Sequence, residues 1–466
     1  MKFNRYIFRK ELLDLWRERT IWWAVGTFIF LLAASAVVSS RFQQQEANEK
    51  RLAEVASRKH WEQQTEKNPH SAAHFGIYLF QPQAPLAFIE PGIRKFTGTS
   101  AFLEPHRRNE MQFNASQDSN NGFRLGNLTP GFLALYLLPL LVMLTGFGML
   151  SKEREGGTLR FTLSTGVTRN TVVFTKWIVL TLITILFSIP ILLLCIAFHP
   201  ALTREDFGAL MILWIVYLLH SFMFANITLL VSALSKSASQ TFIMLLAIWM
   251  MMMLTIPKLA SVTATAAYPL PNLKDFQSTI LADKEMVNGH GGAWSEKLLT
   301  ETLSKFGVDS VQQLPFNFAG LRLEVGEERE TALYRKHYNN LLKQREKQGL
   351  IYDLSGILSP LIPFHSLATA IAKTDVTNHR AFEEAAEQYR YEFVQVLNRD
   401  VKENSRWGEN YYADTTLWKK IPPFEYTSPP LSETLESHQG ALLIAAVWLA
   451  VSLLAIFVCP RFLSNE

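Results

Sequence analysis

The sequence predicts an all-α polytopic membrane protein with six transmembrane helices and a large extracytoplasmic domain, mixed but mainly helical, built from two insertions. Three observations predict this class. Six long stretches contain no Asp, Glu, Lys or Arg, and long charged segments interrupt the series in two places. A mean hydropathy of +0.08 is too low for a protein made of spans alone and too high for an ordinary soluble enzyme.

Each uncharged stretch is long enough to cross a bilayer, because a spanning helix needs about 20 mostly apolar residues and a central charge costs about 2.5–3.5 kcal/mol. The six stretches are Thr20–Ser40, Leu125–Ser151, Trp177–Thr203, Phe207–Ser235, Ser237–Pro257 and Ser437–Pro460. Buried helices of a soluble protein are the alternative, but those are usually shorter and keep a polar face. The first stretch ends in small residues like a signal peptide, and we expect an uncleaved anchor.

A further uncharged stretch, Leu354–Ala372, carries Pro360 and Pro363 near its centre. Two interior prolines disrupt a helix strongly. We therefore predict an interfacial or re-entrant segment here, with a seventh span as the alternative.

Lysine and arginine near the ends of the spans predict the orientation. Residues 1–19 and 152–176 are rich in both, and with six spans they lie on the same side, which we expect to be the cytoplasm. The tail, residues 461–466, lies there too, so both termini are predicted to be cytoplasmic. A seventh span would move only the tail to the other side.

The two insertions, residues 41–124 and 258–436, make up more than half of the chain and are predicted to lie outside. We expect Phe42–Lys67 to prolong the first span as a helix and Glu328–Lys347 to form another charged helix. In residues 78–113, prolines and glycines predict loops and short strands. One more helix is predicted where apolar residues recur at helical spacing, at Phe382, Ala386, Tyr389, Phe393, Val396 and Leu397.

The sequence lacks the Gly-x-x-x-x-Gly-Lys-Ser/Thr phosphate loop and the His-Glu-x-x-His pair, so we expect no catalytic, cofactor-binding or metal-binding residues in this chain. Cys195 and Cys459 both lie in apolar runs, which argues against a disulfide framework. His60, His70 and His74 lie closest together among the histidines, and we expect ordinary solvated side chains there rather than metal ligands. The net charge of +4 indicates no nucleic-acid partner.

Polar residues inside a span often line a cavity. His220 and Asn226, both in the fourth stretch, are therefore candidates for lining a polar path through the membrane. Packing against a neighbouring helix is the alternative for His220.

The N-terminal segment "MKFNRYIFRKELLDLWRERT" combines regularly spaced large apolar residues with many basic ones. This pattern is typical of a helix that lies in the membrane interface. A cytosolic tail that only obeys the charge rule is the alternative.

The segment "SKEREGGTLRFTLSTGVTRNTVVFTKW" is predicted to form a compact helix-turn-helix. The glycines at 156 and 157 end the helix that prolongs the second span, and "TLRFTLS" forms a short helix with Leu159 and Leu163 on one face. Gly166 permits a turn, and Thr168 caps the next helix. Such a structure suits docking into a groove on a soluble partner, whereas a solvated positive loop is the alternative.

"EREGGTLRFTLSTGVTRNTVVFTKW" resembles the cytosolic loop of ABC-2-type transporter permeases, although a proline often stands where this chain has Gly166. "FRKELLDLWRERT" resembles the elbow helix of that family. "LSPLIPFHSLATAIAKTDVTNHRAFEEAAEQYRYEFVQVLN" and "WKKIPPFEYTSPP" are similar to the permease subfamily labelled domain of unknown function 3526. The similarity covers nearly the whole chain.

The resemblance implies a permease subunit of a bacterial inner membrane, paired with a second permease subunit that is either identical or related. It also implies two separate ATP-binding cassette subunits that carry the ATP and Mg²⁺, so that this chain holds no cofactor, and it leaves room for a periplasmic partner. The ATPase-coupling residues implied are Glu153, Arg154, Glu155, Gly157, Thr158, Leu159, Phe161 and Arg169.

Two other functions compete with a permease: a membrane-anchored extracytoplasmic binding or sensing protein without transport, and a membrane enzyme. A sensor needs fewer spans, and an enzyme should show a convergent set of acid, base or metal-binding residues. Only a permease explains the six spans, the missing phosphate loop and the docking segment together. The substrate and the direction of transport do not follow from the sequence.

Overall fold

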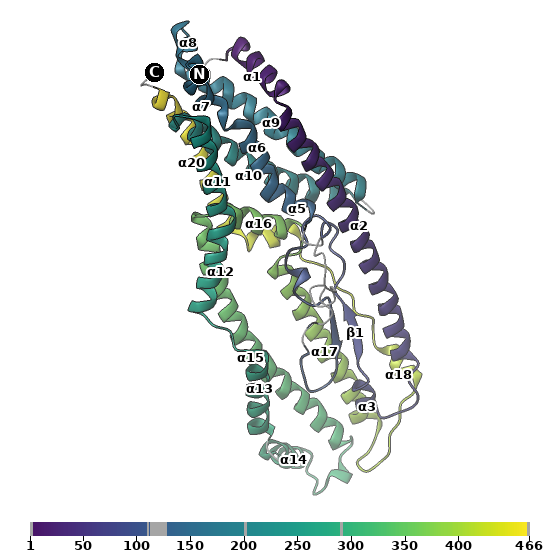
Figure 1. Ribbon diagram of the computed structural model, residues 1–466. Coiled ribbons are helices and arrows are strands. Elements are labelled where there is room, and N and C mark those ends of the chain that lie inside the picture. The colour runs from purple at the N-terminus through teal and green to yellow at the C-terminus, as the bar shows by residue number, and fades with distance from the viewer. Residues whose placement is uncertain (1–2, 110, 112–127, 200–202, 289–291, 464–466) are drawn as a thin grey trace.

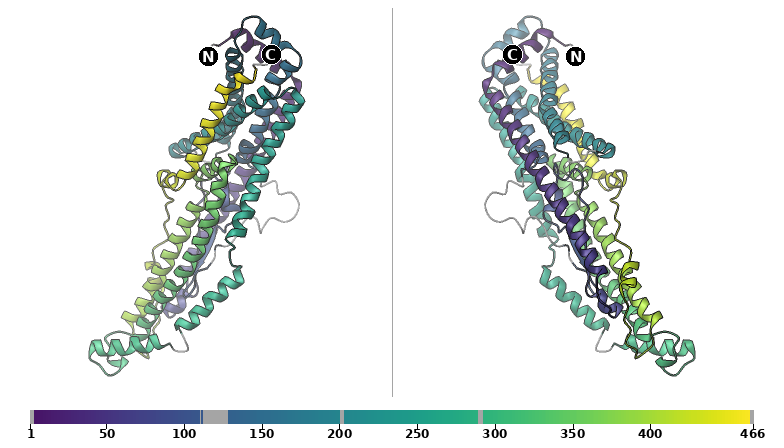
Figure 2. Two further views of the ribbon diagram at one scale, coloured as in Figure 1. Left: turned by 90° about the vertical axis from the view of Figure 1, so that its left-hand side faces the viewer. Right: turned by 90° about the vertical axis from the view of Figure 1, so that its right-hand side faces the viewer.

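The computed structural model describes residues 3–109, 111, 128–199, 203–288 and 292–463. Helices gather into a bundle at one end of an elongated molecule, and a longer, more open region continues from the other end of the bundle (Figures 1 and 2). We call the end of the bundle that carries both termini the proximal end. We call residues 43–109, 268–354 and 376–430 the distal region.

Six helices among the described residues are long and apolar enough to cross a membrane, as predicted, so the chain is a multi-pass membrane protein. They are α2 (Arg19–Glu62), the run Pro130–Glu155 made of α5 (Pro130–Phe132), α6 (Leu138–Gly146) and α7 (Gly148–Glu155), then α9 (Arg169–Phe198), α10 (Arg204–Leu234), the run Ala238–Ala267 made of α11 (Ala238–Met250) and α12 (Ile256–Ala267), and α20 (Gln439–Val458), which continues to Leu463. α1 (Arg5–Arg17) and α8 (Thr158–Ser164) lie at the proximal end (Figure 1).

The first span continues without a break into the distal region, and the fifth span ends at the border of that region. α2 extends to Glu62, which confirms the predicted prolongation of the first span. The fifth span runs through a π-helical turn at Met251–Thr255 into α12, ten residues beyond the predicted end. A movement of these spans therefore shifts parts of the distal region directly.

The stretch Leu354–Ala372 contains α16 (Leu361–Ile371), a helix of 11 residues. At 1.5 Å per residue it is about 16 Å long, roughly half of the hydrocarbon thickness. α16 lies across the end of the bundle and packs against α10 and α20 (Figure 1). It is therefore too short for the seventh span, and the predicted re-entrant or interfacial position fits its length.

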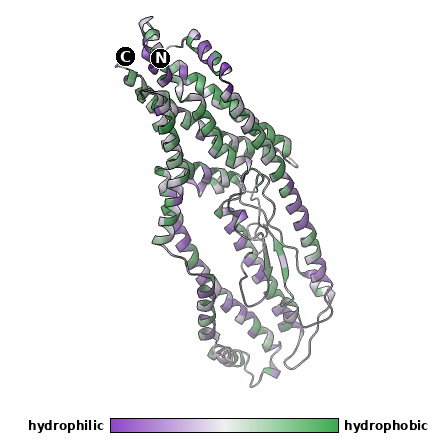
Figure 3. Cartoon of the chain, in the orientation of Figure 1, coloured by the Kyte–Doolittle hydropathy of each residue, from purple (hydrophilic) through white to green (hydrophobic). Residues whose placement is uncertain are grey.

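Hydrophilic residues are frequent in the distal region and at the proximal end, whereas hydrophobic residues concentrate in the bundle between them (Figure 3). The helices of the distal region are α3 (Pro69–Ala73), α13 (Leu273–Asn288), α14 (Ala293–Phe306), α15 (Phe318–Leu354), α17 (Val376–Asn404) and α18 (Thr415–Lys420), with α19 (Leu431–Glu436) leading into α20. The predicted short strands are present as β1 (Ile77–Phe80) and β2 (Ser100–Leu103), an antiparallel pair in which Ile77 faces Leu103.

A small apolar core joins the elements of the distal region. The Trp61 ring of α2 lies edge-on to Phe393 of α17 at 4.8 Å and to Trp418 of α18 at 5.8 Å between centroids. The predicted apolar stripe of α17 is buried at Phe393 and Leu397 but wrong at Val396, which is 40% exposed. Val396 lies about 100° around the helix from Leu397 and so leaves the buried face.

Candidate functional site

The segment between the second and third spans forms the predicted helix-turn-helix at the proximal end. Gly157 precedes α8 with a φ of +73°, in open space, so the position needs glycine for its backbone angle rather than for room. Gly166 adopts a φ of +86° in the turn after α8. The Thr168 hydroxyl accepts a hydrogen bond from the Thr171 N–H at 3.3 Å and caps α9, as predicted.

A buried cluster of charges holds α1 against the first turns of α9 and the end of α7. Lys176, at the start of the third span, has a side chain only 1% exposed. Its ammonium lies 2.5 Å from Glu11 and 3.0 Å from Glu153, and it donates to the Met149 carbonyl at 2.7 Å. An unpaired buried charge is costly, and these three partners stabilise the Lys176 ammonium inside the protein.

Lys10 completes the cluster on its exposed side. It contacts Glu153 and lies 3.0 Å from the Glu11 carboxylate. Burial disfavours the charge of Lys10, but Glu11 and Glu153 raise the pKa of this amine above its ordinary value. Lys10 therefore remains a cation. Two lysines and two glutamates, drawn from α1, α7 and α9, fix the N-terminal helix to the bundle.

The next two residues of the charged run reach other helices. Arg154 donates to the carbonyls of Ala233 at 2.8 Å and Ser235 at 2.6 Å, where α10 ends, and to the Phe462 carbonyl at 3.1 Å. The Glu155 carboxylate accepts from the Ala238 N–H at 3.0 Å, at the first turn of α11. A cation at a helix C-terminus and an anion at a helix N-terminus both interact favourably with the helix dipole.

These contacts place Glu153, Arg154 and Glu155 differently from one another. In this chain Glu153 contacts α1 and α9, and Arg154 and Glu155 contact α10 and α11. The run therefore ties the base of α8 to four helices of its own bundle.

α8 presents one large apolar side chain to the outside. Phe161 is 72% exposed, whereas Leu159 is fully buried against the bundle of its own chain. Thr158 and Arg169, at the two ends of the helix-turn-helix, are exposed. Of the residues expected at a docking surface, Leu159 thus supports α8 from beneath, and Phe161 is the apolar group that a partner could contact.

The two candidates for a polar path both lie fully buried on α10. Asn226 accepts from the Trp177 indole N–H at 2.8 Å and donates to Ser452 at 3.1 Å, so it links α9, α10 and α20. The His220 ring lies 3.2 Å from the Leu135 carbonyl and packs against Phe364 of α16. Within the chain, both residues therefore connect neighbouring segments of the bundle, Asn226 by hydrogen bonds and His220 by a hydrogen bond and ring packing.

A comparison with protein-family models matches residues 5–463 to the ABC-2 family transporter proteins. The chain belongs to the ABC-2 transporter family. A search of the curated proteins found no match to this chain. ABC-2 permeases are typically non-catalytic membrane subunits, and membership implies an ATPase partner. The exposed helix-turn-helix at the proximal end is therefore the candidate coupling surface of an ABC-2 membrane component.

A network of polar contacts around Glu90 connects the bundle of this ABC-2 protein to the distal region. Sequence reasoning missed this network. Glu90 is buried and accepts from the Tyr217 hydroxyl of α10 at 3.1 Å, and its backbone carbonyl accepts from Thr374 at 2.8 Å. The His365 ring of α16 lies 3.5 Å from the same carboxylate. The available signal was a single acidic residue in the apolar piece "PLAFIEPG".

Proposed function

We propose that this ABC-2 membrane component is the permease subunit of an ATP-driven transporter in a bacterial inner membrane. Two ATP-binding cassette subunits carrying ATP and Mg²⁺ dock at α8, and a second permease subunit, identical or related, completes the complex. The proximal end then lies in the cytoplasm and the distal region outside. The segment "WKKIPPFEYTSPP" supports assignment to the subfamily labelled domain of unknown function 3526.

One observation carries the proposal: α8 is exposed, while the residues at its base are bonded to the rest of the bundle. Phe161 offers an apolar side chain, and burying it against a partner contributes about 1.5–3 kcal/mol. Glu153 and Arg154 connect the same segment to α1, α9 and α10. A partner that moves α8 therefore pushes several helices at once, which is what a coupling element must do.

The distal region is proposed to act as a lid or as a docking platform for an extracytoplasmic partner. The first span continues into it, the helix that ends the fifth span packs against α15, and Glu90 links it to α10. The distal region is therefore connected to the bundle rigidly enough to follow its movements, and no flexible linker among the described residues separates the two.

A binding or sensing role without transport is the second candidate. An open groove of about 850 Å³ lies in the distal region between α2, β1 and the segment around Phe424, and it is lined in part by Arg58 and Lys59. A sensor would use this groove without ATP turnover. A substrate-dependent rise in ATP hydrolysis by the complex distinguishes a transporter from such a sensor.

Replacing Phe161 with aspartate tests the docking surface. We expect Phe161→Asp to insert normally but to lower co-purification of the ATPase about tenfold or more, because it removes the exposed apolar contact and adds a charge. Tyr412→Asp is the matched control: that ring is 61% exposed but lies in the distal region, so ATPase binding should be unchanged. Equal ATPase recovery with wild type and Phe161→Asp would rule out docking at α8.

Cysteine labelling tests the orientation, in a background where the buried Cys195 and Cys459 are replaced by serine. Thr165 and Thr300 are both exposed threonines whose hydroxyls donate to a carbonyl of the preceding turn, at the proximal end and in the distal region. The cells are treated so that the outer membrane is permeable and the inner membrane stays intact. We then expect a maleimide that cannot cross the inner membrane to label Thr300→Cys but not Thr165→Cys. Labelling at position 165 before lysis would reverse the proposed topology.

A further inference from the structure

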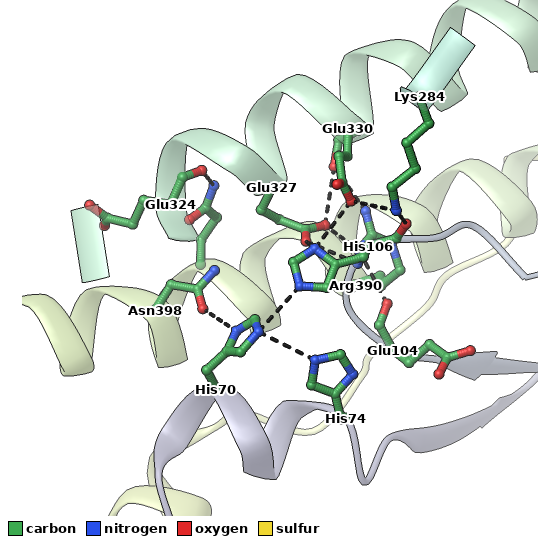
Figure 4. A network of polar contacts seen from close by, with 12 residues as sticks. His70, His74, Glu104, His106, Lys284, Glu324, Glu327, Glu330, Arg390 and Asn398 are labelled. Carbon is green, nitrogen blue, oxygen red and sulfur yellow. Dashed lines mark hydrogen bonds and ion pairs between the residues drawn. The ribbon is translucent and has the colours of Figure 1, made fainter. Parts of the chain in front are cut away.

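Three histidine rings converge in the distal region (Figure 4). His70 lies on α3, His74 follows one turn later, and His106 lies in the loop after β2. The Nε2 atom of His70 is 3.3 Å from Nε2 of His74 and 3.2 Å from Nε2 of His106. The ligand atoms of all three rings lie within 4.8 Å of one another.

The opposite nitrogens of two of these rings face hydrogen-bond acceptors. Nδ1 of His70 lies 2.8 Å from the side-chain oxygen of Asn398, and Nδ1 of His106 lies 3.1 Å from a carboxylate oxygen of Glu330. Because an ionised carboxylate can only accept, Nδ1 of His106 carries the proton, and with the Asn398 oxygen as its acceptor Nδ1 of His70 does too. A neutral imidazole has one proton, so the Nε2 atoms of His70 and His106 keep their lone pairs.

Two lone pairs that face each other at 3.2 Å repel unless a cation lies between or beside them. Histidine metal ligands show this arrangement: one ring nitrogen binds the metal, and the other donates its N–H to a carboxylate or a carbonyl-type oxygen. With Zn–N bonds of about 2.0–2.1 Å in a tetrahedral site, two ligand nitrogens lie about 3.3 Å apart. The two measured separations match this value.

The carboxylates next to His106 are suited to support rather than to ligation. Glu327 is fully buried and pairs with Arg390 at 2.5 Å, and Glu330 pairs with Lys284 at 3.1 Å. Because both carboxylates already form ion pairs with these cations, we expect the two glutamates to orient the His106 ring rather than to bind a metal ion.

Hydrogen bonds fix the backbone of His106 as well as its ring. It adopts a φ of +66°, unusual for a residue other than glycine. Its N–H donates to Glu327 at 3.1 Å, and its carbonyl accepts from Lys284 at 3.0 Å. Strained backbone persists where several contacts hold it, and it is common at ligand sites.

We propose that His70, His74 and His106 bind one divalent transition-metal ion of the zinc type through their Nε2 atoms, with water in the open fourth position. His74 is exposed, which gives the ion a route to the site. The ligands come from residues 69–106, while Glu330 and Asn398 come from α15 and α17. A bound ion therefore clamps the two insertions of the distal region together, whatever the chain transports.

The test uses the full-length protein in detergent, stripped with a chelator, incubated with Zn²⁺ and separated from free metal. We expect one zinc per chain by elemental analysis and a higher Tm with zinc than without it. His74→Ala, which removes an exposed ring, should lose at least about 90% of the bound zinc and its Tm shift. His60→Ala is the matched control, because His60 is also exposed but its ring packs at a tilt against Phe75, outside the cluster.

A supporting residue provides a second measurement. Glu330→Gln should weaken zinc binding about 10–100-fold without removing a ligand, the usual effect of losing such a partner. Wild type that holds no more zinc than His74→Ala, or that shows no zinc-dependent Tm shift, would overturn the proposal and leave the cluster as a site for a shared proton. Equal zinc loss in His60→Ala would also overturn it.

Discussion

Lys176→Ala is expected to destabilise the proximal end strongly and to loosen the contact between α1 and α9. The substitution removes the buried cation next to Glu11 and Glu153, and only the half-exposed Lys10 still contacts the two carboxylates. Breaking a buried ion pair by removing one partner costs about 3–5 kcal/mol. We expect a clear fall in the Tm of the purified protein and weaker recovery of the ATPase, because Glu153, next to α8, loses its connection to α9.

Lys152→Ala is the matched control for this prediction. That side chain is 72% exposed, and its amine lies 3.7 Å from Glu18, a surface pair worth about 0–1 kcal/mol. A rescue variant separates the charge effect from lost packing: Glu11→Gln and Glu153→Gln combined with Lys176→Met remove the stranded charges. The explanation fails if Lys176→Ala and Lys152→Ala shift the Tm equally.

The elements that could be predicted from the sequence depend on local signals. Long uncharged runs predicted the six spans, and the glycines at 157 and 166 with Thr168 predicted the helix-turn-helix, because spans and caps are determined by a few neighbouring residues. Within Leu354–Ala372 the longest helix is α16 with 11 residues, which is too short to span a membrane as the alternative of a seventh span requires.

The contacts between distant residues could not be predicted. Lys176 was visible only as one of several flanking positive charges, and Glu11, which it contacts, lies 165 positions away in the sequence. Histidines were grouped by sequence distance, which placed His60 beside His70 and His74. The folded chain replaces His60 with His106, because the pairing of β1 with β2 brings the loop after β2 over α3.

Arg390→Met is expected to have the largest effect in the distal region. The guanidinium is 2% exposed and bonds Glu327 at 2.5 Å and Glu387 at 2.9 Å, so it joins α15 to its own helix, α17. Methionine keeps much of the volume but leaves Glu327, which has no exposure, without a counter-charge. We expect a loss of about 3–5 kcal/mol, seen as a lower Tm and faster proteolysis of the distal region.

Arg380 offers the control within the same helix. It bonds Glu384 at 2.7 Å and Glu346 at 2.9 Å, but its side chain is 40% exposed, so Arg380→Met should cost no more than about 1 kcal/mol. Arg390→Lys should remain destabilised, because one ammonium cannot reproduce the forked contacts of a guanidinium with two carboxylates. Adding Glu327→Gln to Arg390→Met should restore part of the Tm, since the buried charge is gone. If Arg390→Met and Arg380→Met have the same Tm, the buried pair does not hold α15 and α17 together, and their apolar contacts must do so instead.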